Sequence, residues 1–232
     1  MAHADDPAVR AELVRRLDHH LDHYLGAWPV RGLVVVASPL RDLPGWDGRV
    51  RPITGVAAPG GTVVSVPPGI LAEAQQLQRA GGFDALVTGL GELVGLPDDR
   101  LRGGVFRALR FLADLEPLGE WVPPDDPRLP DWLRPFNGEV LASFDDAGRY
   151  AAGVGQKFHD SFGVEFAIGT EPEHRGKGLA RRLVATAARR AYDEGKVVTY
   201  LHREDNFASA AVAEVAGFPD EGWRALGVPV VE

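Results

Sequence analysis

The sequence contains no cysteine, and this absence excludes several kinds of chemistry. Without thiols the chain cannot form disulfides, use a cysteine nucleophile or build a thiolate metal site. No apolar run approaches the roughly 20 residues that a membrane-spanning helix needs. The start of the chain also lacks the basic and apolar regions of a signal peptide. We therefore expect a cytoplasmic protein.

Positive charge is also scarce, because 25 lysines and arginines stand against 33 aspartates and glutamates, for a formal net charge of −8. Such a chain repels polyanions, so neither nucleic acid nor an anionic membrane is an expected partner. A cationic or amine-bearing partner suits the charge better. Hydrophobic residues make up 45% and charged residues 25%, which is ordinary for a globular chain with a sizeable core.

The first half of the chain has the pattern of a small α/β unit. Leucines at every fourth position predict a helix from Pro7 to about Leu25. His19, His20 and His23 on this helix have metal-like spacing, but a solvated polar face accounts for them, so no metal site is expected. Strands are predicted at 33–37, 50–57 and 62–66, helices at 70–79 and 83–94, and either element at 105–115.

Four prolines between residues 123 and 130 interrupt the chain and predict a boundary. We expect an N-terminal α/β unit at 1–120, a proline-rich linker at 121–131 and a second domain at 132–232. The N-terminal unit either completes the core, makes a dimer contact or shapes the acceptor pocket. In the second domain we expect a helical turn at 132–136, strands at 140–144, 149–158, 163–170 and 196–202, and helices that begin near residues 178 and 206.

The turn between Thr170 and the helix that begins near Gly178 is suited to phosphate. Gly176 and Gly178 let the backbone approach a ligand closely, and the helix start offers unpaired N–H groups. Arg175 and Lys177 add positive charge. A Walker loop is excluded because a glycine follows Lys177 where serine or threonine is required, and the dinucleotide fingerprint G-x-G-x-x-G fails in its last position.

Two motifs point to a known family. The turn reads Arg175-Gly176-Lys177-Gly178-Leu179-Ala180, which fits R-x-x-G-x-A, and a later helix opens with Asn206-Phe207-Ala208-Ser209 and ends with Ala216-Gly217-Phe218. In this order they resemble the cofactor segments of GNAT N-acetyltransferases, from about residue 133 onward. The resemblance implies a mixed α+β or α/β fold with a central, mostly antiparallel sheet flanked by helices, to which the N-terminal α/β unit is added. It also implies acetyl-CoA as co-substrate and no metal.

The resemblance also assigns residues to acetyl-CoA. The turn would hold the diphosphate, the strand edge at Ile168 and Thr170 would pair with the pantetheine amides, and Asn206 with Ser209 would hold the arm from the second helix. The cofactor-binding residues expected in this way are Ile168, Thr170, Arg175, Gly176, Lys177, Gly178, Leu179, Ala180, Arg181, Asn206 and Ser209.

An ammonium must lose a proton before it attacks a thioester, so a base accelerates the reaction by roughly 10²–10⁴-fold. Glu165 is the candidate, because it shares one face of its strand with two small residues, Ala167 and Gly169, which leave room for the arm and the amine. Partial burial is expected to raise the pKa of Glu165 toward neutrality. His159 and His202 are the reserve bases.

Many relatives in the family carry a tyrosine seven residues after the asparagine, where it protonates the departing thiolate, but this chain has Ala213 there. Tyr200 or His202 is expected to replace it, unless the step needs no acid. The expected function is transfer of an acetyl group from acetyl-CoA to a primary amine, of a small molecule or a protein, by direct attack in a ternary complex. The alternative is a CoA-binding regulatory or scaffold module without activity. The identity of the amine stays open, as does a homodimer.

Overall fold

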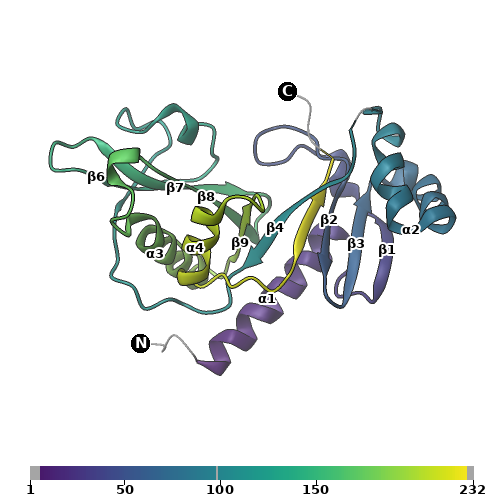
Figure 1. The fold of residues 1–232 in the computed structure, drawn as a ribbon, viewed down its shortest axis with the longest axis horizontal. Helices are drawn as coiled ribbons and strands as arrows, with labels where there is room; N and C mark the ends of the chain where they lie inside the picture. The colour runs from purple at the N-terminus through teal and green to yellow at the C-terminus, as the bar shows by residue number, and fades with distance from the viewer. Residues whose placement is uncertain (1–5, 98, 229–232) are drawn as a thin grey trace. The chain divides into compact units, whose positions relative to one another are not determined.

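The structure is a computed structural model that describes residues 6–97 and 99–228. It contains two compact units, which we describe separately. Unit 1 comprises Met1–Leu17 and Arg107–Asp220, and unit 2 comprises Asp18–Phe106 and Glu221–Glu232. Helix α1 (Pro7–Leu25) and strand β4 (Arg102–Ala108) carry the chain from one unit into the other (Figure 1).

This division falls earlier in the chain than the linker predicted at 121–131, and the proline-rich segment belongs to unit 1. Strand β5 (Glu120–Val122) lies at the edge of the sheet and pairs only with β6 (Val140–Phe144). An edge strand tolerates neighbouring prolines because one of its sides needs no ladder hydrogen bonds. The start of α1 also joins unit 1, where Val9 and Leu13 pack into the hydrophobic core.

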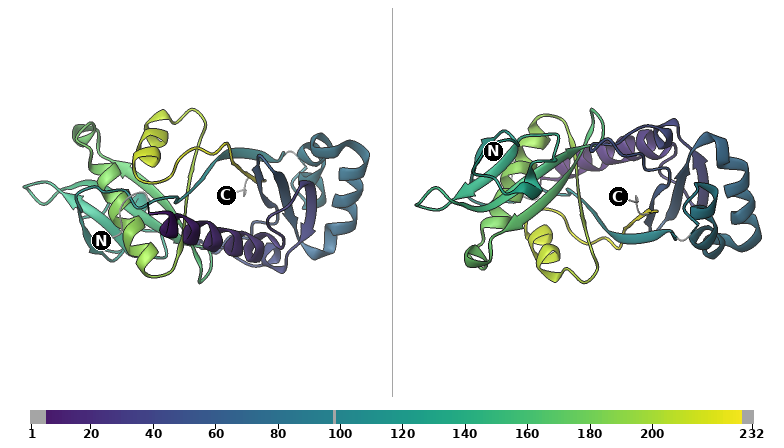
Figure 2. Two further views of the ribbon diagram at one scale, coloured as in Figure 1. Left: turned by 90° about the horizontal axis from the view of Figure 1, so that it is seen from below. Right: turned by 90° about the horizontal axis from the view of Figure 1, so that it is seen from above.

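Unit 2 is an α/β unit, in which a sheet is joined by one long helix. Its strands follow the order β1-β3-β2-β10-β4, with β1 parallel to β3 and the pairs β3–β2, β2–β10 and β10–β4 antiparallel. The two predicted helices form one helix, α2 (Leu71–Leu93), with a kink at Gly81 and Gly82, and both views of Figure 2 show it stacked beside the strands. The strands are β1 (Gly32–Ala37), β2 (Thr54–Ala58), β3 (Gly61–Val66), β4 and β10 (Arg224–Gly227).

Several expectations for unit 2 need correction. The strand expected at 50–57 begins only at Thr54. The segment 105–115, which allowed either helix or strand, contains the end of strand β4. Strand β10 was not predicted at all. His20 is not solvated: its side chain is 5% exposed and stacks on Tyr24 with ring centroids 5.7 Å apart.

Unit 1 holds the second half of the chain, where the predicted elements and the observed ones agree closely. Its strands follow the order β9-β8-β7-β6-β5, and only β8 and β9 run parallel. Helices α3 and α4 lie against these strands (Figure 1). The elements not yet given are η3 (Asp131–Leu133), β7 (Tyr150–Phe158), β8 (Gly163–Thr170), η4 (Pro172–His174), α3 (Leu179–Asp193), β9 (Val197–His202) and α4 (Phe207–Val215).

The core of unit 1 lies between the sheet and α3. One face of this helix is apolar and buried, and Leu183, Val184 and Ala187 have no exposed surface. They pack with Phe166 of β8 and Phe218, which follows α4. The predicted fold, a mixed α/β arrangement with a mostly antiparallel sheet flanked by helices, is therefore confirmed. Across the part of the chain that the structure describes, the helices are too short or too polar to cross a bilayer.

Candidate functional site

Strands β8 and β9 pair along only part of their length. Their register ends at Phe166 and Tyr200, whereas β8 stays paired with β7 as far as Thr170. From Ala167 onward, the edge of β8 that faces β9 therefore has no strand partner among the described residues. Free N–H and C=O groups on such an edge can pair with an extended ligand.

The turn after β8 is shaped by two glycines in the left-handed region. Gly176 has φ 75° and Gly178 has φ 77°, a conformation that costs other residues roughly 1–2 kcal/mol. Gly178 is the N-cap of α3, and no side chain caps that helix. Its first N–H groups therefore lack a partner within the helix and carry the positive end of the helix dipole, which favours an anion.

Helix α4 begins differently, because the side chain of Asn206 caps it. The Oδ1 atom of Asn206 accepts a hydrogen bond of 3.1 Å from the backbone N–H of Ser209. The Ser209 hydroxyl in turn lies 2.9 Å from the hydroxyl of Tyr200. This contact links the start of α4 to Tyr200, the last residue of β9 that pairs with β8.

A pocket of about 680 Å³ joins these features, between the open end of β8 and the starts of α3 and α4. The structure brings every predicted cofactor-binding residue to it except Lys177, whose Nζ atom lies 3.3 Å from Nδ1 of His174. Their role in binding stays a prediction. The pocket is lined by Ile168, Gly169, Thr170, His174, Arg175, Gly176, Gly178, Leu179, Ala180, Arg181, Asn206, Ala208, Ser209, Ala211, Val212 and Val215.

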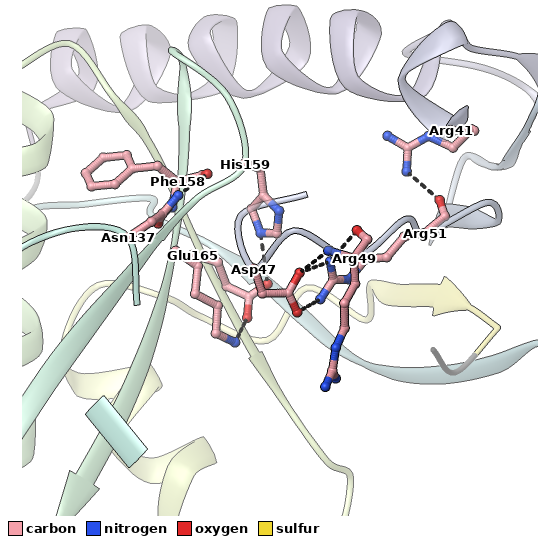
Figure 3. Close-up of polar contacts among 9 residues, drawn as sticks. Arg41, Asp47, Arg49, Arg51, Asn137, Phe158, His159 and Glu165 are labelled. Atoms are coloured by element: carbon pink, nitrogen blue, oxygen red, sulfur yellow. Dashed lines mark hydrogen bonds and ion pairs between the residues drawn. The ribbon is translucent and has the colours of Figure 1, made fainter. Parts of the chain in front are cut away.

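Glu165 does not line this pocket and is held by two neighbouring side chains. Lys157 donates to its Oε1 atom at 2.5 Å, and Nε2 of His159 lies 3.4 Å from its Oε2 atom (Figure 3). Burial alone would raise the pKa of Glu165, but the hydrogen bond from His159 and the charge of Lys157 outweigh it and lower the pKa to about 2. The expected rise toward neutrality is therefore wrong, because a buried carboxylate with partners is stabilised in its ionised form.

The two candidates for the general acid differ in what surrounds them. The Tyr200 side chain is 1% exposed, and burial raises its pKa, so the hydroxyl keeps its proton at neutral pH. It reaches the pocket wall through Ser209. His202 has both ring nitrogens engaged, since Nε2 accepts from Arg107 at 3.0 Å and Nδ1 lies 2.8 Å from the carbonyl of Arg203. This geometry favours Tyr200.

Sequence reasoning missed Arg107, which is 5% exposed and connects several elements around the pocket. Besides His202, its guanidinium contacts Glu214 of α4 at 2.8 Å and the carbonyl of Phe218 at 2.9 Å. An arginine in a segment that allows helix or strand gives no signal of such a role, because its partners lie about 100 residues away in the sequence.

Sequence reasoning also missed the cover over one face of β8. The side with Glu165, Ala167 and Gly169 is not open at Gly169, where an added Cβ would collide with the ring of Trp132. An added Cβ on Gly155 of β7 would likewise collide with the ring of Phe136. Glycines at alternate positions of a strand, together with two aromatic residues four apart, are the signal that could have indicated this packing.

Comparison with known proteins agrees with these observations. A model of the acetyltransferase (GNAT) family matches residues 106–218. No curated protein sequence matches the chain. Within the described residues, no group of three or more histidine, cysteine, aspartate or glutamate side chains could hold a metal ion.

Several solved structures are similar to the chain at low identity. A GCN5-related N-acetyltransferase-like protein from Streptococcus suis is 13% identical, with a TM-score of 0.47, over 95% of this chain and 100% of the other. A GNAT acetyltransferase from Colwellia psychrerythraea is also 13% identical, with a TM-score of 0.47, over 71% and 75% of the two chains. A GCN5-related N-acetyltransferase from Kribbella flavida is 20% identical, with a TM-score of 0.41, over 62% and 65%.

The matched segment contains the free strand edge, the uncapped start of α3, the capped start of α4 and the pocket between them. Residues 106–218 therefore form a domain of the acetyltransferase (GNAT) family.

Proposed function

We propose that unit 1 transfers an acetyl group from acetyl-CoA to a primary amine by direct attack in a ternary complex. Family membership supports acyl transfer. The choice of acetyl-CoA depends on one observation, the pocket that joins an uncapped helix start to a free strand edge. A ligand with a diphosphate at one end and amides along a thin arm complements both features, and the volume lies in the usual range of roughly 300–1,000 Å³ for ligand pockets.

The turn fits a diphosphate. A Cβ added to Gly176 would meet nothing within 4 Å, so the backbone there is open to a ligand. The side chains of Arg175 and Arg181 line the same part of the pocket and add charge to the N–H groups of α3. These residues would bind the diphosphate oxygens.

The open end of β8 fits the arm. Backbone groups near Ile168 and Thr170 would pair with its amides, as an added strand pairs with a sheet edge, and Asn206 with Ser209 would bound the other side. When bound, acetyl-CoA supplies the acetyl group as a reactive thioester. The pairing of β8 with β9, which ends at Phe166, would then limit how far the arm extends along the strand edge.

Glu165 and His159 are proposed to act together on the amine. A carboxylate with a pKa of about 2 is ionised but weakly basic, so Glu165 alone accepts a proton poorly at neutral pH. Imidazole exchanges protons readily in that range. We therefore assign to Glu165 the orientation of His159 and the stabilisation of its charged form, and to His159 the acceptance of the proton from the ammonium.

Tyr200 is proposed as the acid for the departing thiolate. Because burial raises its pKa, it holds a proton at neutral pH, and it can pass this proton through the hydroxyl of Ser209. Tyr200→Phe removes the proton but keeps the buried ring. Its kcat is expected to fall at least tenfold with little change in KM for acetyl-CoA.

A second function, a CoA-binding module without activity, is favoured by two observations. Ala213 stands where many family members carry the tyrosine, and the low pKa of Glu165 makes it a weak base. Release of free thiol separates the two functions. Binding of CoA without thiol release across a broad panel of amines would support the inactive module.

The test of the proposal starts with calorimetric titration of the whole chain with acetyl-CoA, followed by thiol release with a panel of primary amines. We expect one site per chain, with an affinity in the range of about 1 µM–1 mM that is usual for enzyme substrates. No binding at millimolar acetyl-CoA would remove the proposal. Binding followed by steady thiol release with any amine would support it against the inactive module.

A further inference from the structure

The register of β7 and β8 determines which side chains share a face. Gly153 pairs with Gly169, Gly155 with Ala167, and Lys157 with Glu165. Directly paired residues of antiparallel strands project to the same side. One face of this strand pair therefore carries three glycines and an alanine, followed by the ion pair, and we call it the glycine face.

The closed end of β8 is open only on the glycine face. On the opposite face Val164 and Phe166 are each 1% exposed, and Phe166 packs edge-on against Phe218, whereas Ile168 and Thr170 line the pocket. On the glycine face, Ala167 and Glu165 are partly exposed. The glycine face near Ala167 is therefore the approach we consider for an acceptor that attacks a thioester held along the free edge of β8.

Trp132 is the residue that presents ring surface there. Its indole covers Gly169, a residue that also lines the pocket, and its ring centroid lies 6.0 Å from that of Phe136 in an edge-on arrangement. Neighbouring side chains of the same segment are hidden, with Leu133 at 0% and Phe136 at 8% exposure. Trp132 is 39% exposed, so part of its side chain stays accessible beside Gly169.

The charges on this face do not favour a polycation. Both carboxylate oxygens of Glu165 already have cationic or imidazole partners, Lys157 at 2.5 Å and His159 at 3.4 Å. Bringing another ammonium to Glu165 would have to displace one of them. An aromatic ring beside a saturated ion pair is instead suited to an apolar group, which gains by burial and by ring packing.

We propose that Trp132 contacts the acceptor and selects amines that carry an aromatic group near the nitrogen over linear polyamines. This inference rests on the proposed function, because it takes the thioester to lie along the free edge of β8. Trp132 is a specificity-determining residue here and takes no part in proton transfer.

The test uses the whole chain loaded with CoA, the thiol product, so that no turnover occurs during titration. CoA binding is measured first, and its absence would count against the proposed function before any amine is added. 2-Phenylethylamine and spermidine are then titrated by calorimetry, with and without CoA. The wild type is expected to bind 2-phenylethylamine at least tenfold more tightly than spermidine.

Variants assign this preference to the ring. Trp132→Ala is expected to weaken the binding of 2-phenylethylamine about tenfold, because one packed aromatic pair and its buried area are lost. The affinity for CoA is expected to stay within threefold of the wild type. Trp132→Leu keeps an apolar cover on Gly169 should the alanine variant unfold, and is expected to lose about fivefold. Phe162→Ala is the matched control, since Phe162 is 42% exposed and precedes the opposite end of β8.

Three results would each overturn the proposal. The first is spermidine binding as tightly as 2-phenylethylamine. The second is no binding of 2-phenylethylamine in either state of the protein. The third is an affinity for 2-phenylethylamine that Trp132→Ala and Trp132→Leu leave unchanged, or that Phe162→Ala lowers equally.

Discussion

The two ends of strand β8 differ in how completely their polar groups are satisfied. At the closed end, before Phe166, the strand is paired on both sides, and Glu165 has a partner for each carboxylate oxygen. At the open end, the edge toward β9 has no strand partner among the described residues, and the following helix starts at a glycine without a side-chain cap. Eight residues of one strand thus join a saturated region to an unsaturated one.

This difference separates stability from binding. Buried polar groups that are paired stabilise the fold, and removal of one partner leaves the other uncompensated. Groups that the fold leaves unpaired are available to a ligand, which then satisfies them. Substitutions at the closed end should therefore lower stability, whereas substitutions at the open end should lower affinity for CoA.

The largest effect is expected for Gly178→Asp at the open end. The new carboxylate would stand at the start of α3, where the diphosphate is proposed, and would both repel it and occupy the helix N–H groups. Calorimetry should show at least a hundredfold loss of CoA affinity, about 2.7 kcal/mol. The cost in stability should stay near 1 kcal/mol, because aspartate tolerates the left-handed conformation better than most residues.

Gly148→Asp is the matched control for this variant. Gly148 has φ 76°, close to the 77° of Gly178. An added Cβ would meet nothing within 4 Å at Gly148, whereas at Gly178 it would lie 3.0 Å from Nε of Arg181, the end of a flexible side chain. It lies in the turn between β6 and β7 and does not line the pocket. An equal loss of CoA affinity in both variants would show that charge or strain anywhere in unit 1 is enough, and the comparison of the two ends would fail.

The second effect concerns Glu165→Gln at the closed end, where stability should change and CoA affinity should not. Removal of the charge leaves Lys157 and His159 without their carboxylate, which should lower the free energy of unfolding at neutral pH by about 2 kcal/mol. The activity should fall as well, because His159 loses its orienting group. Urea unfolding followed by circular dichroism gives the first value.

The difference in the free energy of unfolding between the wild type and Glu165→Gln should change with pH in one direction. The pKa of Glu165 is about 2 in the folded protein and 4.5 is its reference value, so the carboxylate stabilises the fold above about pH 4.5. That contribution, at most about 3 kcal/mol, is lost as the pH falls from 4.5 toward 2. The wild type and Glu165→Gln should therefore converge in acid. A difference that grows on acidification would contradict the low pKa.

The third effect is smaller and concerns both the stability of the fold and the affinity for CoA. Asn206→Ala removes the cap of α4, which should cost about 1 kcal/mol of stability, and removes a pocket-lining amide, which should weaken CoA about fivefold. Asn206→Asp keeps a good cap but brings a negative charge. It should therefore retain the melting temperature and still lose affinity. If Asn206→Ala lowered the melting temperature while Asn206→Asp kept the CoA affinity of the wild type, Asn206 would contribute to stability alone.

The sequence predicted the second half of the chain well because its signals are local. Strand β8, helix α3 and the cap at Asn206 each follow from period, glycine position and capping chemistry within about ten residues. The family resemblance named ten of the sixteen residues that line the pocket, and it did not name Gly169, His174, Ala208, Ala211, Val212 and Val215.

What the sequence did not reveal depends on contacts between distant segments. The pKa of Glu165 was predicted in the wrong direction because burial is visible in a strand pattern but the partners Lys157 and His159 are not. The cover of Trp132 on Gly169 and the links of Arg107 are of the same kind. In each case the deciding neighbour is set by register or packing, which no local pattern encodes.

Lys177 gives the smallest expected effect and tests how closely the motif describes the open end. It belongs to the glycine-rich turn, but it does not line the pocket, and its Nζ atom contacts His174. An exposed charge contributes little and is screened by salt. Lys177→Ala should therefore weaken CoA less than threefold, whereas Arg181→Ala, which removes a lining side chain, should weaken it about tenfold. If Lys177→Ala had the larger effect at both low and high salt, the turn would hold the diphosphate from the side of Lys177, and the uncapped start of α3 would not be the main anion site.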